Sequence, residues 1–260
     1  MSELAAAEGR SVRGLTAFVT GAGSGMGRAT AQVFAADGAQ VAVTDVNGEA
    51  AEAVAAELRA AGLKARAWRL DVSDPDAIVR VVEEAAAAFG GIDALINNAG
   101  VPGGAPIDSP AYEDVWARSV SILLTAQQRL IRAALPHLRR SNAPRIVNIA
   151  STEALGATSR DSPYAAAKAG VTGLTRALAV ELGREGITVN CVCPGPILTG
   201  MTAAVPEADK QTYAKRRTAL GRYGRPEEVA HITLSLCLPS ASFITGATIP
   251  VDGGLMARNA

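Results

Sequence analysis

The chain has 260 residues, of which 48% are hydrophobic and 19% charged, a balance that excludes a disordered protein and suits one compact α/β domain. Its 25 basic and 25 acidic residues give a formal net charge of zero, so no overall field draws it to nucleic acid or to an anionic membrane. The N-terminal stretch lacks a basic segment followed by an apolar one, and no apolar run reaches transmembrane length. We therefore expect a cytoplasmic protein with no nucleic-acid or membrane partner.

The predicted elements alternate along the chain. Strands are predicted at 15–20, 40–44, 65–70, 92–96, 146–150, 188–192 and 247–251, where short apolar runs suit buried parallel strands. Helices are predicted at 29–36, 47–61, 74–89, 112–138, 164–183 and 226–238. With no repeat and no break in composition, this order predicts a single doubly wound, Rossmann-like α/β domain over 1–260, with a parallel sheet, helices on both faces and a core at about 14–255.

A glycine-rich turn joins the first predicted strand to the first predicted helix and reads Thr20-Gly21-Ala22-Gly23-Ser24-Gly25-Met26-Gly27. Such a turn is typical of phosphate binding, because backbone N–H groups and a helix N-terminus can approach an anion without Cβ atoms in the way. A flexible loop is disfavoured, since a strand and a helix hold its two ends. Met26 stands where the plain G-x-G-x-x-G fingerprint needs its third glycine, so the pattern is Gly21-x-x-x-Gly25-x-Gly27.

An acidic residue, Asp45, ends the second predicted strand, about 20 residues beyond the glycine turn. A carboxylate at this place can accept hydrogen bonds from the adenosine ribose hydroxyls and repels a 2′-phosphate. This placement favours NAD over NADP as the cofactor. A second interpretation, that Asp45 caps the following helix, stays open, and one residue can do both.

A tyrosine and a lysine, Tyr164 and Lys168, are four residues apart in an alanine-rich run, so a helix would place both side chains on one face. A positive charge within roughly 4–6 Å favours the phenolate, and lowering the tyrosine pKa by about three units corresponds to roughly 4 kcal/mol. Ser151 ends an apolar run, where its hydroxyl would stand at the carboxyl end of a strand. The spacing of Tyr164 and Lys168 alone is more typical of a surface pair, so its weight comes from the accompanying motifs.

The three cysteines are Cys191, Cys193 and Cys237. Cys191 and Cys193 would share one face of a strand, where a chelating or redox pair is conceivable, but no third or fourth ligand lies nearby in the sequence. Buried free thiols in a reducing compartment are therefore the expectation, and no metal site is predicted.

Taken in order, these motifs resemble the short-chain dehydrogenase/reductase family over about residues 14–255. The residues that carry the resemblance are Thr20 to Gly27, Asp71, Asn97-Asn98-Ala99-Gly100, Ser151, Tyr164-x-x-x-Lys168, and Pro194-Gly195 with Thr199, and Ser151 precedes Tyr164 by the family's usual thirteen positions. The resemblance implies an NAD-dependent oxidoreductase that acts on a secondary alcohol or ketone and forms a homotetramer. Its catalytic residues would be Ser151, Tyr164 and Lys168, with Tyr164 as the general acid/base.

The resemblance also implies the cofactor contacts. Asp71 and Val72 would meet the adenine, Asn98 the ribose, and Ile197 and Thr199 the carboxamide. Ser24 and Val46 stand where NADP-using relatives often carry a basic residue, and neither is basic, which again favours NAD. The full predicted set is Gly21, Ser24, Gly25, Met26, Gly27, Asp45, Asp71, Val72, Asn98, Ala99, Gly100, Tyr164, Lys168, Pro194, Gly195, Ile197 and Thr199.

One position departs from the family pattern. Counting seven residues from Trp116 places Leu123 where the family usually has an asparagine that helps to hold a water in a proton relay. Leucine offers no polar side chain, although its backbone carbonyl could still bind the water. This departure motivates the alternative function, an NAD(H)-binding regulatory protein with weak or lost turnover. A third reading, a partner-binding scaffold, is disfavoured by the glycine turn and Asp45.

The sequence narrows the substrate only to a broad class. The polar segment at about 200–223 follows the carboxyl end of a strand, which favours a lid over a substrate. By position, Pro102, Glu153, Ala154 and Leu155 would border the pocket together with that segment. Such a mixed polar and apolar wall suits many small hydroxy compounds.

Overall fold

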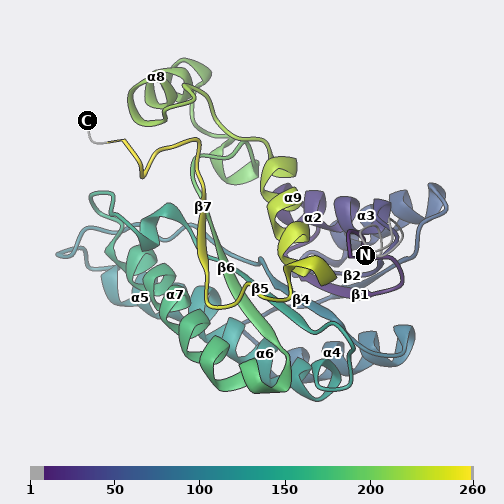
Figure 1. Cartoon of the computed structure of the whole chain (residues 1–260). Helices are drawn as coiled ribbons and strands as arrows, with labels where there is room; N and C mark the ends of the chain where they lie inside the picture. The colour runs from purple at the N-terminus through teal and green to yellow at the C-terminus, as the bar shows by residue number, and fades with distance from the viewer. Residues whose placement is uncertain (1–8, 259–260) are drawn as a thin grey trace.

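The computed structural model describes residues 9–258, which form a seven-stranded parallel sheet between two layers of helices (Figure 1). The strands are β1 (Thr16–Thr20), β2 (Gln40–Asp45), β3 (Ala65–Arg69), β4 (Ala94–Asn97), β5 (Arg145–Ile149), β6 (Thr188–Pro194) and β7 (Thr248–Val251). Their order in the sheet is β3-β2-β1-β4-β5-β6-β7, so the chain reverses direction across the sheet between β1 and β4. The predicted doubly wound α/β fold is confirmed, and this reversal is where such sheets open a crevice for a ligand.

The helices are α2 (Gly25–Ala36), α3 (Gly48–Ala60), α4 (Pro75–Phe89), α5 (Tyr112–Val120), α6 (Ala126–Leu138), α7 (Ser162–Leu182), α8 (Glu207–Arg217) and α9 (Pro226–Cys237). Short helical turns are η1 (Ser121–Thr125), η2 (Thr152–Ala154), η3 (Gly183–Glu185), η4 (Gly200–Thr202) and η5 (Pro239–Ala241). Figure 1 shows α2, α3 and α9 on one face of the sheet and α4, α6 and α7 on the other.

Successive side chains along each strand pack alternately into two hydrophobic cores, one on each face of the sheet. In β1 every residue is buried; Ala17 and Val19 belong to the cluster beneath α2, α3 and α9, whereas Phe18 belongs to the cluster beneath α4, α6 and α7. Residues of a strand point alternately to its two faces, so a strand covered on both sides must be apolar throughout. This is why β1 reads as a continuous apolar run. Because β1 is packed on both faces, the position of its last residue, Thr20, is fixed, and so is the start of the glycine turn that follows.

The structure confirms the bounds of the helix predicted at 112–138 but places a π-helical segment within it. The chain there forms α5 and α6, joined by the π-helical segment η1 at Ser121–Thr125. A π-helix accommodates one extra residue within a helical run, and such segments are frequent at functional sites. A tertiary contact accompanies this one: Leu124 lies so close to Gly170 on α7 that a Cβ at Gly170 would be 2.7 Å from the leucine Cδ2.

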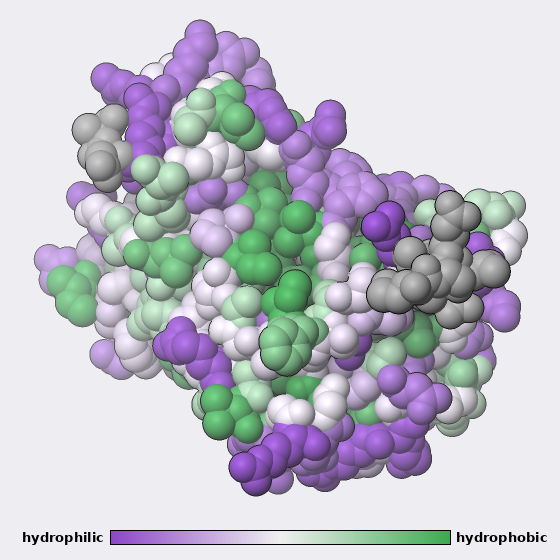
Figure 2. Space-filling model, viewed as in Figure 1, coloured by the Kyte–Doolittle hydropathy of each residue, from purple (hydrophilic) through white to green (hydrophobic). Residues whose placement is uncertain are grey.

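The polar segment at about 200–223 contains η4 and α8. Helix α8 stands apart from the sheet, near the end of β7, and Figure 2 shows a hydrophilic surface in that region. Within residues 9–258, no helix combines the length and the apolar character that a bilayer span requires.

Candidate active site

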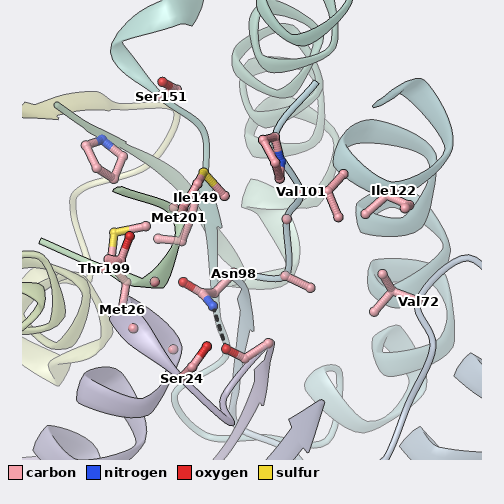
Figure 3. Close-up of a pocket in the computed structure, with 18 of the residues that line it drawn as sticks. Ser24, Met26, Val72, Asn98, Val101, Ile122, Ile149, Ser151, Thr199 and Met201 are labelled. Carbon is pink, nitrogen blue, oxygen red and sulfur yellow. Dashed lines mark hydrogen bonds between the residues drawn. The ribbon is translucent and has the colours of Figure 1, made fainter. Parts of the chain in front are cut away.

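A cavity of about 840 Å³ lies at the carboxyl ends of the central strands (Figure 3). The ends of β2, β5 and β6 line it, together with the segments that follow β1, β3 and β4. It brings together every site residue predicted from the sequence: Gly21, Ser24, Gly25, Met26, Gly27, Asp45, Asp71, Val72, Asn98, Ala99, Gly100, Ser151, Tyr164, Lys168, Pro194, Gly195, Ile197 and Thr199.

The glycine turn lies at one side of this cavity, between β1 and α2. Gly21 has a left-handed backbone with φ of 62°, and a Cβ at Gly27 would lie 2.0 Å from the carbonyl oxygen of Gly21. Any side chain at position 27 would therefore push the start of α2 away from the turn. The Asn98 amide donates to the carbonyls of Thr20 at 2.8 Å and of Gly21 at 3.2 Å and so ties β4 to the turn (Figure 3). Asn98 thus has a structural role that the sequence did not predict, in addition to its place on the cavity wall.

The carboxylate of Asp45 lies next to the glycine turn. Its Oδ2 accepts from the backbone N–H of Gly23 at 2.9 Å, and its Oδ1 accepts from that of Asn47 at 2.9 Å. The cap of α3 is Asn47, whose side chain accepts from the Ala50 N–H at 3.1 Å. The interpretation of Asp45 as the helix cap is therefore wrong, and its carboxylate lines the cavity.

Asp71 and Val72 also line the cavity. The hydroxyl and backbone N–H of Ser73 donate to Asp71 Oδ1 at 2.7 and 2.9 Å. These two hydrogen bonds, helped by the Arg69 guanidinium, hold the pKa of Asp71 below its ordinary value. Arg69 itself donates to the Val46 carbonyl at 3.3 Å and does not line the cavity, whereas the carboxylates of Asp45 and Asp71 both do.

Ser151, Tyr164 and Lys168 meet at the other side of the cavity. Ser151 follows β5 as the cap of η2, and its Oγ accepts from the Glu153 N–H at 3.1 Å. Tyr164 and Lys168 lie one turn apart on α7, and the Lys168 Nζ is 5.6 Å from the centre of the Tyr164 ring. The Nζ donates to the carbonyl of Ile149 at 2.8 Å, which fixes a side chain that is only 3% exposed. The expected one-face placement of the tyrosine and lysine is confirmed.

In this structure burial outweighs the expected electrostatic effect of Lys168 on Tyr164. Burial raises the pKa of Tyr164 to about 12; the hydrogen bond from Ser151 lowers it, and the carboxylates of Asp161 and Glu153 raise it further. Burial also lowers the pKa of Lys168 to about 8. The sequence showed the spacing of the two groups but not their desolvation, which disfavours the charged form of each.

Several residues of the cavity wall were missed. Arg118, Ser121 and Ile122 come from α5 and η1, and Val101 follows β4. Met201 also lines the cavity, as expected for the segment at about 200–223 (Figure 3). A uniform helical pattern in the sequence gives no signal that the middle of the helix faces a cavity. The sequence therefore could not indicate Arg118, Ser121 or Ile122. Pro102 lines the cavity as expected, whereas Glu153, Ala154 and Leu155 do not. Instead, Glu153 accepts from the backbone N–H and the hydroxyl of Thr158 at 2.7 and 2.8 Å.

Leu123, the departure from the family pattern, lies in η1 and is fully buried. It does not line the cavity, and its Cδ2 packs over Gly100, where a Cβ would be 3.4 Å away. The side chain therefore serves packing at the end of β4.

The three cysteines are buried and free. Among residues 9–258, no group of three or more His, Cys, Asp or Glu side chains is arranged to hold a metal ion.

Comparisons with known proteins agree with this site. A family model described as enoyl-(acyl carrier protein) reductase matches residues 21–256. The cis-4-hydroxycyclohexanecarboxylate dehydrogenase of Sinomonas cyclohexanicum is 42% identical over 93% of this chain and 96% of its own, and the meso-2,3-butanediol dehydrogenase of Serratia marcescens is 41% identical over 93% and 94%. A crystal structure of a dehydrogenase/reductase from Sinorhizobium meliloti is 38% identical, covers 99% of this chain and 100% of its own, and superposes with a TM-score of 0.89. The chain therefore belongs to the short-chain dehydrogenase/reductase family.

Proposed function

We propose that this protein is an NAD-dependent oxidoreductase that transfers a hydride between the nicotinamide and a secondary alcohol or ketone. One observation carries the proposal: Ser151, Tyr164 and Lys168 share a cavity with the glycine turn and Asp45. The relatives named above are dehydrogenases of hydroxy compounds, which supports this class of reaction.

The residues present fit the dinucleotide. At Gly21 and Gly27 the chain approaches itself too closely for any Cβ, so the turn leaves its N–H groups and the N-terminus of α2 open to a diphosphate. Asp45 would hold the adenosine ribose, Asp71 and Val72 would border the adenine, and Ile197 with Thr199 would hold the carboxamide. The remaining predicted cofactor contacts are Ser24, Gly25, Met26, Asn98, Ala99, Gly100, Pro194 and Gly195.

The catalytic residues would act on the substrate oxygen. NAD, when bound, supplies the hydride acceptor. Tyr164 would donate a proton to the oxygen of a ketone or take one from an alcohol, and Ser151 would hold that oxygen as charge develops. Lys168, fixed by the Ile149 carbonyl, would position the tyrosine and the nicotinamide ribose. Because burial raises the pKa of Tyr164 to about 12, the phenol is protonated at neutral pH, which suits ketone reduction and makes alcohol oxidation faster as the pH rises.

The substrate proposed is a small, largely apolar secondary alcohol. Val101, Pro102, Ile122 and Met201 contribute apolar surface to the cavity, while Arg118 is a charged group on its wall. A ring alcohol or a vicinal diol would present one hydroxyl to Tyr164 and apolar carbon to these side chains. The segment at about 200–223, which contributes Met201, would act as the lid.

The test of this proposal is the absorbance at 340 nm with NAD and a panel of cyclic and short-chain secondary alcohols at alkaline pH. At least one alcohol should give NADH formation. If no alcohol and no corresponding ketone reacts although the protein binds NADH in a melting-shift assay, the oxidoreductase proposal is wrong and a binding protein remains.

Cofactor choice is expected to follow Asp45. The wild-type protein should use NAD at least about tenfold better than NADP in kcat/KM, a difference of about 1.4 kcal/mol, because the carboxylate repels a 2′-phosphate. Asp45→Ser should narrow the difference, mainly by improving the use of NADP. Equal efficiencies of the two cofactors with the wild-type protein would contradict the assignment.

The alternative function, an NAD(H)-binding regulator, rests on the buried Leu123. If the wild-type protein is an enzyme, Leu123→Asn should change kcat by no more than roughly tenfold, or about 1.4 kcal/mol of barrier. It should also destabilise the fold, because truncating a buried leucine costs about 2 kcal/mol or more. Steady-state kinetics and urea unfolding measure the two effects. An inert wild type combined with an active Leu123→Asn variant would favour the regulator.

Self-association completes the proposal. The edge strand β7 pairs on one side only, with β6, and the exposed Phe243 and Ile244 precede it. Figure 2 shows apolar residues gathered on the face along which β7 runs in Figure 1. A homotetramer would cover this edge, so light scattering should give four times the chain mass of 26.5 kDa, and a monomer would contradict it.

The three buried thiols suit a reducing compartment, and we propose the cytoplasm.

A further inference from the structure

A buried glutamine on α6 is not used by the reaction proposed above. Gln127 is 2% exposed and follows Leu123 by one helical turn. The residues that continue this row, Leu130, Ala134 and Leu138, are apolar and at most 1% exposed. Gln127 thus occupies a core position that its neighbours in the row fill with hydrocarbon.

The amide of Gln127 has no hydrogen-bond partner within the described part of the chain, residues 9–258, at either Nε2 or Oε1. Within the same residues the Oδ1 of Asn97 also has none, although its Nδ2 donates to the Oδ1 of Asn148 at 2.8 Å. Buried amides in folded proteins are nearly always hydrogen-bonded, and where protein groups do not satisfy them an ordered water does. An amide with both of its atoms unmatched points to water more strongly than a lone unmatched oxygen does.

The helix that carries Gln127, α6, packs against β4, which ends at Asn97. Leu123 packs over Gly100, and Leu130 shares a core cluster with Leu95. Gln127 lies between Leu123 and Leu130 in its row, and Asn97 lies between Leu95 and Gly100 in the chain, with its side chain on the same face of β4 as that of Leu95. The helix and the strand therefore bring the Gln127 and Asn97 amides towards one another.

A chain of hydrogen bonds leads from Asn97 across β5 to α7, the helix that carries the catalytic lysine. Asn97 donates to Asn148, and Asn148 donates through Nδ2 to the Oγ1 of Thr175 at 3.0 Å. Thr175 lies seven residues, about two turns, beyond Lys168 on α7. Asn148 also directly precedes Ile149, whose carbonyl holds the Lys168 ammonium at 2.8 Å. Asn97, Asn148 and Thr175 thus form a hydrogen-bonded row from β4 through β5 to α7, and β5 is also the strand whose end holds the lysine.

We propose that Gln127 and Asn97 hold a buried water, and that through this water Gln127 is a positioning residue for proton exchange at Lys168 in a protein whose relay asparagine is replaced by Leu123. The effect on the reaction rests on the proposed function, whereas the water site does not. Polar groups behind Lys168 favour its charged form and so help Tyr164 to lose its proton. The titratable groups that face Lys168 are Cys191 and Cys193 on β6 and Tyr164 on its own helix, and Asp161 and Glu153 face Tyr164.

The kinetic test compares Gln127→Leu with Gln128→Leu, a matched change at the adjacent, only partly buried position. In Gln127→Leu, kcat for alcohol oxidation near pH 8 should fall by about threefold or more. The rising limb of its pH profile should move to higher pH by about half a unit or more, since a less polar surrounding disfavours the ammonium. Gln128→Leu should change neither. Identical pH profiles of wild type and Gln127→Leu would contradict the positioning role.

Two measurements test whether the water is present and do not depend on catalytic activity. A high-resolution crystal structure should show a water at about 3 Å from both the Gln127 amide and Asn97 Oδ1, and a dry contact or a direct bond between the two amides would contradict the proposal. In melting experiments Gln127→Leu should leave the midpoint unchanged or lower it, because Asn97 and the water lose a partner. A higher melting midpoint for Gln127→Leu would show that the Gln127 amide is buried without a water or any other partner, and would contradict the proposal. If the wild type turns over no alcohol, the proposed function fails while these two results still decide the site.

Discussion

Replacing Tyr164 with phenylalanine is expected to lower turnover by about 10² to 10⁴ while NADH binding persists. Phenylalanine keeps the ring in its place on α7 and removes the hydroxyl that would exchange a proton with the substrate oxygen. The hydroxyl lies in the cavity with Ser151 and is not needed for the hydrogen bond that fixes Lys168 to Ile149. Binding of the dinucleotide and folding should therefore survive a change that stops the chemistry.

The measurement combines steady-state rates at 340 nm with the melting shift produced by NADH. Tyr112→Phe is the matched control, because it removes the same hydroxyl from α5, outside the cavity. The control should retain wild-type turnover. A Tyr164→Phe protein with wild-type turnover would place the proton donor elsewhere.

Replacing Lys168 with methionine is expected to remove a pH-dependent cost of about 3 kcal/mol from the folded protein. Burial lowers the pKa of this lysine from 10.5 to about 8. Between these two pH values the unfolded chain holds a proton that the folded protein releases, so the stability of the wild type rises with pH across this interval. Below pH 8 the cost is fully present, and the variant, which has no group to titrate there, does not bear it.

Urea unfolding near pH 7 and near pH 10 measures this effect as the difference between wild type and variant, in which the other groups largely cancel. From pH 7 to pH 10, the free energy of unfolding of the wild type should rise by about 3 kcal/mol relative to that of Lys168→Met. Lys64→Met serves as the control for losing a lysine at an exposed position. A difference that does not change with pH would show that Lys168 is solvated in the folded protein. Catalytic sites that retain such a buried charge trade stability for function.

Local signals predicted much of the fold. Asp74 and Pro75 mark the start of α4, and the structure begins that helix at Pro75 with the Asp74 side chain accepting from the N–H groups of Asp76 and Ala77. The glycine turn was recognisable because its backbone conformation depends on the glycines themselves. These features are encoded within a few residues, which is why a sequence alone reveals them.

Features that depend on distant contacts were not predicted. The π-helical segment η1 lies within a run of good helix formers, and the contact that accompanies it is with Gly170, far along the chain. The pKa values of Tyr164 and Lys168 depend on burial by other elements, so the spacing of the two residues gave the wrong direction for the tyrosine. The role of Gln127 could not be inferred at all, because only the packed structure shows that its amide is buried without a protein partner.

The central claim is hydride transfer from a secondary alcohol carbon to NAD, and deuterium labelling tests it most directly. An alcohol that carries deuterium on the carbinol carbon should yield NADH one mass unit heavier than that from the unlabelled alcohol, and the initial rate should fall because the transferred bond is now to deuterium. The wild-type protein should form this heavier NADH, and Tyr164→Phe should form it about 10² to 10⁴ times more slowly. NADH of unchanged mass, or no NADH from any labelled alcohol that the protein binds, would contradict the account.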